Sequence, residues 1–390
     1  MPGTREQPFV VMAKPVGSRC NMHCAYCYYL EKGQFSSHAK QTRMSFDLLE
    51  KLIRQTIESC GGPVVSFTWH GGEPTLAGLD FYKKAVELEK KYLPRGWQVW
   101  NNLQTNGLLL NDAWCRFLKE NGFDVGLSID GCEAVHDRNR RDLGGNGTYD
   151  RVRKAASRLQ KAGIQPDLLC TVNSASAESP LDVYRGLREI GTGWVQFIPI
   201  VVRLPDGSFS EESITPEGYG RFLTEVFDEW VTQDLGKLDV QLFAETARIL
   251  AGGSASLCWM SETCGRVLIA EEDGGIYSCD HFVDSEHRLG TLAGAKLASM
   301  ANSDFQFNFG DSKRDALSAE CRRCPYLRFC NGGCPKDRFW QSEDGEAGQY
   351  YLCEGLKAFF SHAEPVLLRV MEMSRQGMKP DAIMESLNEE

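Results

Sequence analysis

The stretch "SRCNMHCAYCYY", residues 18–29, places three cysteines within eight positions, at Cys20, Cys24 and Cys27. The next cysteine, Cys60, is remote from this C-x3-C-x2-C motif. A structural zinc site would need a fourth ligand, and a disulfide would leave one thiol over. Three thiolates that hold an iron–sulfur cluster would leave one iron open to a substrate or cofactor. The rest of the chain has to decide among these alternatives.

The composition narrows the setting of the motif. The chain has 390 residues, 42% hydrophobic and 25% charged, which is enough for more than one domain. The N-terminal stretch shows no signal peptide, and no run approaches the ~18 apolar residues of a membrane span, so we expect a cytoplasmic protein without membrane contact. In a reducing cytosol, 15 cysteines indicate metal or catalytic sites rather than disulfides. The net charge of −10 argues against nucleic acid as a partner.

Strand-like and helix-like segments alternate through the first half of the chain. Apolar, β-rich runs lie at 9–13, 64–69, 97–104, 124–129, 166–172 and 194–200. Helical periods lie between them, at 46–57, 78–92, 112–121, 148–163 and 180–190. This alternation predicts an α/β fold of parallel strands joined by right-handed helical crossovers. Functional residues should then lie on loops at the carboxyl ends of the strands.

Those loops have informative sequences. The first expected strand runs into the three-cysteine loop, and the second ends in "WHGGEPT", residues 69–75. Its adjacent glycines allow backbone to approach a ligand closely, and Glu73 could meet an ammonium group. The third and fourth strands end in "QTNG" (104–107) and "SIDG" (128–131). Each is an ordinary turn by itself, but four such ends on one rim indicate a site.

The second half is rich in cysteine. Eight cysteines occur there, at Cys258, Cys264, Cys279, Cys321, Cys324, Cys330, Cys334 and Cys353. They suit two sites of four ligands each. Zinc ribbons are the simpler interpretation of the "CRRC" pair, and iron–sulfur clusters are the alternative.

Taken together, these motifs resemble those of radical S-adenosylmethionine (SAM) enzymes. "CNMHCAYC" resembles their cluster signature, "GGEP" their SAM-binding turn, and the C-terminal cysteines the SPASM domain with its two auxiliary four-iron clusters. Within that group the chain most resembles the anaerobic sulfatase-maturating enzymes, through "HGGEPTLAGLDFY", "LQTNGLLL", "VGLSIDG", "GGIYSCDHF" and "CNGGCPKDRF". The resemblance spans residues 9–365.

The resemblance implies an architecture and a set of cofactors. The fold would be a partial (β/α)6 TIM-like barrel over 1–235, a SPASM domain over 236–355 and a helical segment over 356–390. Cys20, Cys24 and Cys27 would hold a 4Fe–4S cluster whose free iron binds SAM. One electron would then cleave SAM to methionine and a 5′-deoxyadenosyl radical, so the cofactors supply the difficult chemistry.

The resemblance also implies which residues bind SAM. Tyr26 and Val201 would contact the adenine, and Ser128 and Arg140 suit a ribose hydroxyl and the SAM carboxylate. Gly71, Gly72 and Glu73 would hold the methionine ammonium group. The family often has Gln where His70 stands, and we assign His70 no catalytic role.

The auxiliary ligands follow from the same resemblance. The first auxiliary cluster would be held by Cys258, Cys264, Cys279 and Cys334. The second would be held by Cys321, Cys324, Cys330 and Cys353. Spacing alone would have grouped Cys334 with Cys330. The four cysteines left over are Cys60, Cys115, Cys132 and Cys170. We expect them to hold no cluster, and Cys115 and Cys170 to be buried.

The implied reaction is oxidation of a cysteine or serine in a sulfatase polypeptide, within a Cys/Ser-x-Pro-x-Arg motif, to Cα-formylglycine. Asp280 in "YSCDHF" would be the catalytic base that takes the substrate's SH or OH proton, and His281 is a rival. An external electron donor such as flavodoxin or ferredoxin would be a further partner.

Two other functions stay open. Another SPASM-type maturase would crosslink or epimerise a ribosomal peptide, but many of these have a leader-binding domain before the first motif, and we expect none before Cys20. A non-catalytic zinc or iron–sulfur scaffold is the second alternative. The sequence does not choose between a Cys and a Ser target, and it does not set the oligomeric state.

Overall fold

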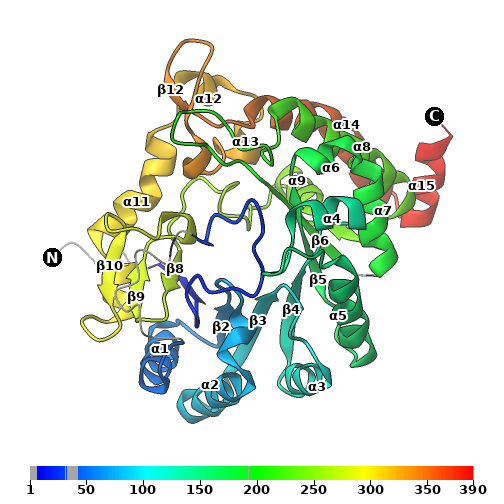
Figure 1. Cartoon of the computed structure of the whole chain (residues 1–390). Coiled ribbons are helices and arrows are strands. Elements are labelled where there is room, and N and C mark those ends of the chain that lie inside the picture. Colours follow the sequence, from blue (N-terminus) through cyan, green and yellow to red (C-terminus); the bar gives the residue numbers. More distant parts are fainter. Residues whose placement is uncertain (1–6, 31, 33–42, 192, 390) are drawn as a thin grey trace.

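The computed structural model describes residues 7–30, 32, 43–191 and 193–389. Its main sheet curves into a partial barrel (Figure 1). The strands are β1 (Val10–Ala13), β2 (Val64–Trp69), β3 (Gln98–Thr105), β4 (Phe123–Ser128), β5 (Asp167–Val172), β6 (Trp194–Pro199), β7 (Asp239–Val240), β8 (Val267–Ala270), β9 (Gly275–Tyr277) and β10 (Arg288–Thr291). Their order in the sheet is β10-β9-β8-β1-β2-β3-β4-β5-β6-β7.

The six predicted strands are β1 to β6, and each matches its expected range to within one residue at either end. They pair in parallel in chain order, which confirms the α/β barrel-like fold class. In β2, buried and less buried residues alternate, because Val65, Phe67 and Trp69 point into the apolar core. A period of two in the sequence therefore sets which face of the strand is buried.

Helices follow the strands and cover the outside of the sheet (Figure 1). In the first 250 residues they are α1 (Phe46–Ser59), α2 (Leu79–Tyr92), α3 (Asp112–Glu120), α4 (Glu133–Asn139), α5 (Tyr149–Lys161), α6 (Ser174–Glu178), α7 (Pro180–Ile190), α8 (Pro216–Gln233) and α9 (Gln241–Leu250). Their starts follow local chemistry: the Ser45 side chain accepts a hydrogen bond from Leu48 N and so caps α1. The five predicted helices are all present.

The sheet does not end at residue 235, where the sequence suggested a domain boundary. β7 pairs with β6 at one edge. At the other side β8 pairs in parallel with β1, with Val10 opposite Val267 and Ala13 opposite Ala270. The cysteine-rich half is therefore joined to the barrel by backbone hydrogen bonds, and the division of the chain at 235 and 355 stays a prediction.

The cysteine-rich half contains short helices, a hairpin and a long final helix. These elements are α10 (Leu297–Ala301), α11 (Asp304–Asp315), α12 (Ala319–Arg323), α13 (Leu327–Cys330), β11 (Trp340–Gln341), β12 (Ala347–Gln349), α14 (Cys353–Arg375) and α15 (Pro380–Asn388). α14 packs along α8 (Figure 1), where the rings of Phe227 and Phe359 lie 5.9 Å apart. The helical tail expected over 356–390 is thus a pair of helices. No helix in the described ranges is long and apolar enough to cross a membrane.

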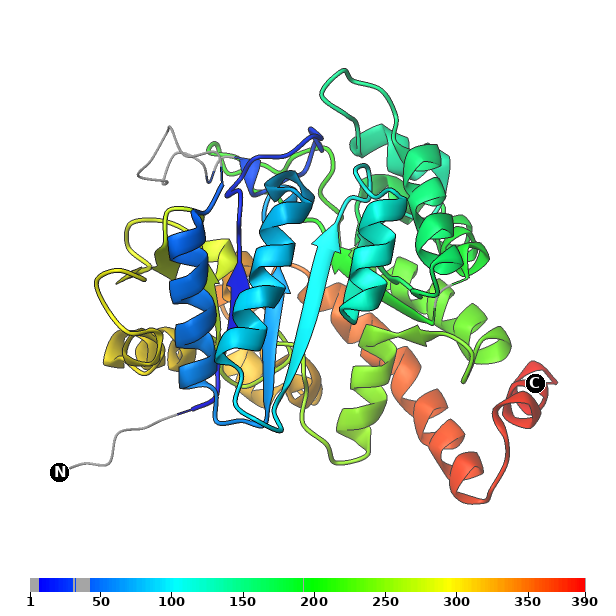
Figure 2. The ribbon, with the colours of Figure 1, turned by 90° about the horizontal axis from the view of Figure 1, so that it is seen from below.

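The strands bring their carboxyl ends to one end of the barrel. Figure 2 shows β1 (dark blue) and β3 (cyan) pointing toward that end, where the dark blue loop that follows β1 lies. β2 and β4 pair in parallel with these strands and so point the same way. The motifs singled out in the sequence follow these same strands, so the fold gathers them at one rim.

Candidate active site

The three-cysteine loop is tied to the glycine turn that follows β2. Gly72 N donates to Gly17 O at 2.8 Å, and Glu73 N donates to Arg19 O at 2.8 Å. A Cβ built on Gly72 would lie 2.0 Å from Arg19 O, so only glycine allows this approach. The two motifs predicted to bind the cluster and SAM therefore lie against each other.

The three cysteines of the loop are each partly buried. Asn106 Nδ2 lies 3.7 Å from Cys20 Sγ, and Cys27 N donates to Cys24 O at 3.1 Å. Burial raises the pKa of Cys20 to about 11 and of Cys24 to about 12, and the charge of Cys27 adds to both shifts. A coordinated metal reverses this preference because it deprotonates its thiol ligands. The donor set therefore fits an iron–sulfur cluster.

The carboxylate of Glu73 holds the glycine turn in shape. It is 1% exposed and caps the 3-10 turn η2 (Pro74–Ala77) by accepting from Thr75 N at 3.0 Å. It also accepts from Thr105 Oγ1 at 2.7 Å and Asn106 N at 2.8 Å, at the end of β3. Burial raises the pKa of Glu73, and these hydrogen bonds oppose that shift. The predicted contact of Glu73 with an ammonium group stays a prediction.

Two of the predicted SAM contacts meet at Asp130, just beyond β4. Arg140 Nε donates to Asp130 Oδ2 at 2.8 Å and Nη2 donates to Oδ1 at 3.1 Å. The Tyr26 hydroxyl donates to Oδ2 at 2.7 Å, and Thr171 N donates to Oδ1 at 2.8 Å. Burial alone would raise the pKa of Asp130, but Arg140 and Tyr26 outweigh it and hold that pKa below its usual range. Asp130 thus fixes the aromatic ring and the guanidinium.

Two other predicted SAM contacts lie on the same strand ends but outside the Asp130 hydrogen bonds. Ser128 Oγ, at the end of β4, accepts from Gln104 Nε2 at 3.0 Å. Val201 lies just after β6 and is 9% exposed. Neither side chain bonds to Asp130.

Asp280 joins the auxiliary cysteine loop to the first cysteine loop. It follows Cys279 and begins the 3-10 turn η3 (Asp280–Phe282). Its Oδ2 accepts from the Tyr28 hydroxyl at 2.6 Å, and Tyr28 is the neighbour of Cys27. Lys14 Nζ lies 3.7 Å from the same oxygen. The predicted base therefore lies where the two cysteine-containing loops meet.

Lys14 is the residue at this junction that sequence reasoning missed. It is 0% exposed, and its Nζ lies 3.3 Å from His70 Nδ1 and 4.3 Å from the centre of the Tyr29 ring. The sequence had shown it only as an interruption of an apolar run. His70 Nδ1 also accepts from Gly71 N at 2.8 Å, so His70 supports the glycine turn that is predicted to bind SAM.

These contacts set the charges around Asp280. Burial opposes ionisation, but His281, Lys14 and the Tyr28 hydrogen bond outweigh it and hold the pKa of Asp280 well below its usual range. Burial lowers the pKa of His281 to about 4 and that of His70 to about 3. At neutral pH, Asp280 is therefore the ionised acceptor and both imidazoles are neutral.

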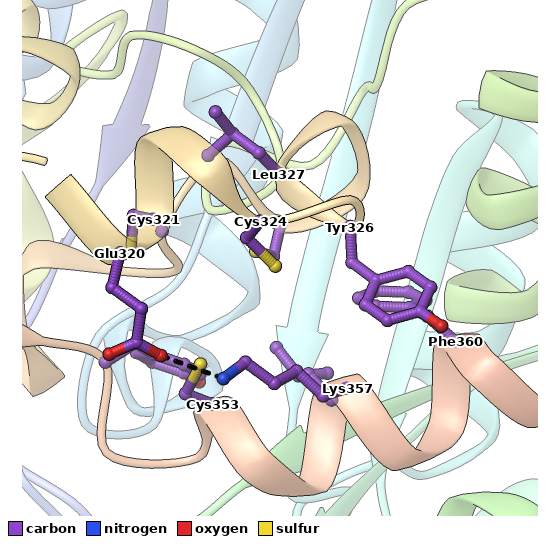
Figure 3. Close-up of a pocket in the computed structure, with 12 residues that line it drawn as sticks. Glu320, Cys321, Cys324, Tyr326, Leu327, Cys353, Lys357 and Phe360 are labelled. Carbon is purple, nitrogen blue, oxygen red and sulfur yellow. Dashed lines mark hydrogen bonds and ion pairs between the residues drawn. The ribbon is translucent and has the colours of Figure 1, made fainter. Parts of the chain in front are cut away.

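One group of four auxiliary cysteines lines a single cavity. Cys321, Cys324, Cys330 and Cys353 face it together with Tyr326, Tyr350, Leu356 and Phe360. Figure 3 labels Cys321, Cys324 and Cys353 and marks the ion pair between Lys357 and Glu320, whose atoms lie 2.9 Å apart. An apolar cavity with four thiols suits a fully cysteine-ligated cluster.

The remaining auxiliary cysteines act on one another electrostatically. Burial raises the pKa of Cys264 to about 11 and of Cys334 to about 12, and the charge of Cys258 adds to both. Cys279 is likewise raised by burial, with Cys334 and Cys258 adding. In contrast, the cysteine charges that raise the pKa of Cys330 are those of Cys321 and Cys324.

The described residues offer no tight site for a single metal ion. Across the described ranges no three His, Cys, Asp or Glu side chains lie close enough to hold one ion. A zinc ion gathers its ligands at ~2.0–2.3 Å, whereas a four-iron cluster keeps its cysteines further apart. Of the other cysteines, Cys115 and Cys170 are buried as predicted, at 2% and 0% exposed.

Comparisons with known proteins agree with this geometry. Residues 15–175 match the model of the radical SAM superfamily. The chain is 40% identical to the serine-type anaerobic sulfatase-maturating enzyme of Bacteroides thetaiotaomicron, over 98% of this chain and 96% of that protein. It is 33% identical to the cysteine-type enzyme of Clostridium perfringens, over 93% of this chain and 98% of that protein. A solved structure described as "Native anSMEcpe with bound AdoMet and Cp18Cys peptide" superposes with a TM-score of 0.85 at 33% identity, over 93% of this chain and 99% of that one. The chain belongs to the radical SAM superfamily and, within it, to the anaerobic sulfatase-maturating enzymes.

Proposed function

We propose that this chain oxidises a cysteine or serine of a sulfatase polypeptide, within a Cys/Ser-x-Pro-x-Arg motif, to Cα-formylglycine. The family supports the reaction class, because relatives over nearly the whole chain are sulfatase-maturating enzymes. The observation that carries the site assignment is the 2.6 Å hydrogen bond from Tyr28 to Asp280. It places a carboxylate from the auxiliary cysteine loop beside the first cysteine loop.

SAM and three 4Fe–4S clusters would supply the hydrogen-atom abstraction and the electron transfers when bound. The first cluster would be held by Cys20, Cys24 and Cys27. The auxiliary clusters would be held by Cys258, Cys264, Cys279 and Cys334, and by Cys321, Cys324, Cys330 and Cys353. The shared cavity of the latter four and the mutual charges of the former four support this interleaved grouping.

The residues for SAM binding are Tyr26, Gly71, Gly72, Glu73, Ser128, Arg140 and Val201. Support is strongest for Arg140. Its Nε and Nη2 donate hydrogen bonds to Asp130, and its Nη1 has no hydrogen-bond partner among the described residues. A free N–H pair on a fixed guanidinium suits a ligand carboxylate. The glycine turn supports the ammonium contact, because its backbone lies directly against the cysteine loop.

Asp280 is the proton acceptor in this proposal. After loss of its β-hydrogen, the substrate must release an electron and its SH or OH proton together. The side chain of Asp280 is 19% exposed, and its lowered pKa keeps it ionised at neutral pH. Such a positioned base contributes ~10²–10⁴-fold to a rate. His281 is neutral at that pH and remains the rival acceptor.

The test is anaerobic incubation of the reconstituted protein with SAM, a reductant and a peptide of the proposed motif, read by mass spectrometry. A Cys peptide should lose about 18 mass units and a Ser peptide about 2, as cofactor-driven oxidation to an aldehyde requires. The same peptide with Ala at the target position is the matched control. A physiological donor such as flavodoxin or ferredoxin should replace the chemical reductant.

A hydrazide reagent separates this proposal from the crosslinking alternative, because only formylglycine provides an aldehyde to label. A product with unchanged mass, or one that resists the hydrazide, would exclude formylglycine formation. The cytoplasmic location expected from the sequence stays a prediction, and fractionation of the source cells would check it.

A further inference from the structure

Two cations in the cysteine-rich half lack the carboxylate partner that buried cations usually have. Lys313, on α11, is 1% exposed. Arg338 follows the 3-10 turn Pro335–Asp337 and is half-buried. Neither forms an ion pair with a carboxylate of the described residues. By comparison, the buried Arg140 lies 2.8 Å from Asp130, and the buried Lys14 lies 3.7 Å from Asp280. Burying a charge without a counter-charge costs desolvation free energy, so we expect another anion to lie near Lys313 and Arg338.

The Lys313 ammonium sits in a cage of backbone carbonyls on the loop that begins with Cys258. Its Nζ donates to Cys258 O at 3.2 Å, to Trp259 O at 2.9 Å and to Ser261 O. Three acceptors use all three hydrogens of an ammonium group, so the protonated form fits this cage. α11 is fixed against the same loop, because Cys264 N donates to Gly310 O at 3.2 Å.

Arg338 occupies the position between the two sets of auxiliary cysteines. Its Nη1 donates to Lys313 O at 2.5 Å and its Nε to Gly332 O at 2.7 Å. Its Nη2 donates to Asn331 O at 2.7 Å. Gly332 and Asn331 belong to the short segment from Cys330 to Cys334, whose two cysteines are assigned to different clusters.

Both cations lie against backbone of the cysteine-bearing segments, Lys313 at Cys258 O and Arg338 at Gly332 O. Burial lowers the pKa of Lys313, and the charges that oppose this shift come from Cys264, Cys258 and Cys334. Burial also lowers the pKa of Arg338, and there the opposing charges are those of Cys321 and Cys330, followed by Cys334 and Cys264. Lys313 therefore lies against the segment of Cys258, in the first set, although its charge also reaches Cys330 of the second. Arg338 donates to the segment between Cys330 and Cys334 and so faces both sets.

We propose that Lys313 and Arg338 are the counter-charges of the auxiliary clusters and raise their reduction potentials, Lys313 chiefly that of the first auxiliary cluster and Arg338 those of both. The inference rests on the proposed cluster ligands. A cluster gains one negative charge when it accepts an electron, and a fixed nearby cation stabilises that reduced form. Both residues are positioning residues, since they donate to backbone and not to substrate.

The test is a redox titration of the reconstituted enzyme with three clusters, followed by electron paramagnetic resonance. The couple whose signal changes on addition of SAM belongs to the first cysteine loop, and the other two are auxiliary. Lys313→Gln keeps an N–H donor for the carbonyl cage but removes the charge. At the wild-type midpoint, the reduced-to-oxidised ratio of one auxiliary cluster should fall about tenfold, which is about 59 mV for a one-electron couple.

Matched variants separate charge from folding. Lys84→Gln also removes one positive charge, here from the exposed ion pair with Glu87, and should change none of the three midpoint potentials. Lys313→Arg should keep the potential near that of wild type. Arg338→Gln should lower the midpoint potentials of both auxiliary clusters. It provides the same test if Lys313→Gln loses its cluster.

The outcomes are distinct for the inference and for the proposed function. Three couples that stay in place in both Gln variants, with full iron content, would overturn the inference and leave the cluster assignment intact. Fewer than two auxiliary couples in the wild-type enzyme would instead contradict the proposed cofactor content. The expected result is a larger shift of one auxiliary couple than of the other in Lys313→Gln, and a shift of both in Arg338→Gln.

Discussion

Replacement of Asp130 by Asn should destabilise the fold and weaken SAM binding together. Each carboxylate oxygen of Asp130 accepts two hydrogen bonds: Oδ2 from Arg140 Nε and the Tyr26 hydroxyl, and Oδ1 from Arg140 Nη2 and Thr171 N. An Asn amide keeps one acceptor and turns its NH₂ group toward two donors in either orientation. The side chain is 0% exposed, so water cannot replace the lost partners.

The magnitude follows from the burial of this pair. Hydrogen bonds to charged groups are worth about 1.5–3 kcal/mol each, and removal of one partner of a buried ion pair costs about 3–5 kcal/mol. We therefore expect Asp130→Asn to lower the free energy of unfolding by about 3–5 kcal/mol. Because Arg140 and Tyr26 lose their anchor, SAM affinity should fall as well.

The assay is a double-mutant cycle with Arg140→Gln, measured by chemical denaturation, with SAM binding measured by equilibrium dialysis. The two changes should be strongly non-additive, since the second removes the charge that the first leaves unpaired. The pair of Arg185 with Glu229 is the control: it is also close, at 2.7 Å, but the Arg185 side chain is 49% exposed. Its cycle should yield about 0–1 kcal/mol.

The pH dependence has a defined sign. The pKa of Asp130 is lowered in the folded chain, so its contribution to stability is present above its unfolded pKa of about 4 and is lost as the pH falls through the folded value. The advantage of wild type over Asp130→Asn should therefore shrink on acidification below about pH 4. Additive mutants, or a loss at pH 7 below about 1 kcal/mol, would refute the reasoning.

Three further predictions follow from the site. Asp280→Asn should keep all clusters and SAM cleavage but lower formylglycine formation about 100-fold, and His281→Gln should be milder; product at the wild-type rate in the Asn variant would exclude Asp280 as the base. Replacing the three cysteines of the loop 20–27 with Ala should reduce the iron content from about twelve to about eight per chain and abolish SAM cleavage, and retained cleavage would contradict the assignment. Gly72→Ala should abolish SAM binding, because its Cβ would lie 2.0 Å from Arg19 O, and dialysis with unchanged affinity would show that the turn can move.

Strands β1 to β6 and the five longer helices between them could be predicted from the sequence. The 18-residue helix α8, strands β7 to β10 and the network that positions the site were not. β1 to β6 match a period of two between helical segments, and residue spacing alone is enough for that. α4 and α6, with seven and five residues, are too short to show a helical period, and they were missed. Their omission did not affect the topology, which depends on the strands.

The missed residues all have partners remote in the chain. Lys14 reads as a polar interruption before Pro15, yet it is completely buried against Asp280, which the sequence places far away. Asp130 reads as part of a turn, and only the fold brings it to Tyr26. Spacing reveals which residues share an element, but not which elements meet, so pairs of this kind require the structure.

The position of β1 in the sheet has a consequence for synthesis of the protein. β1 leaves the ribosome long before one of its two neighbours, β8, has been translated. At ~5–20 residues per second, the edge of β1 waits roughly ten seconds to a minute for Val267–Ala270. During that interval the nascent barrel exposes an unpaired strand edge next to the three-cysteine loop, and such edges promote aggregation. Heterologous expression should therefore gain from slower initiation or from chaperones that protect the nascent chain until β8 docks.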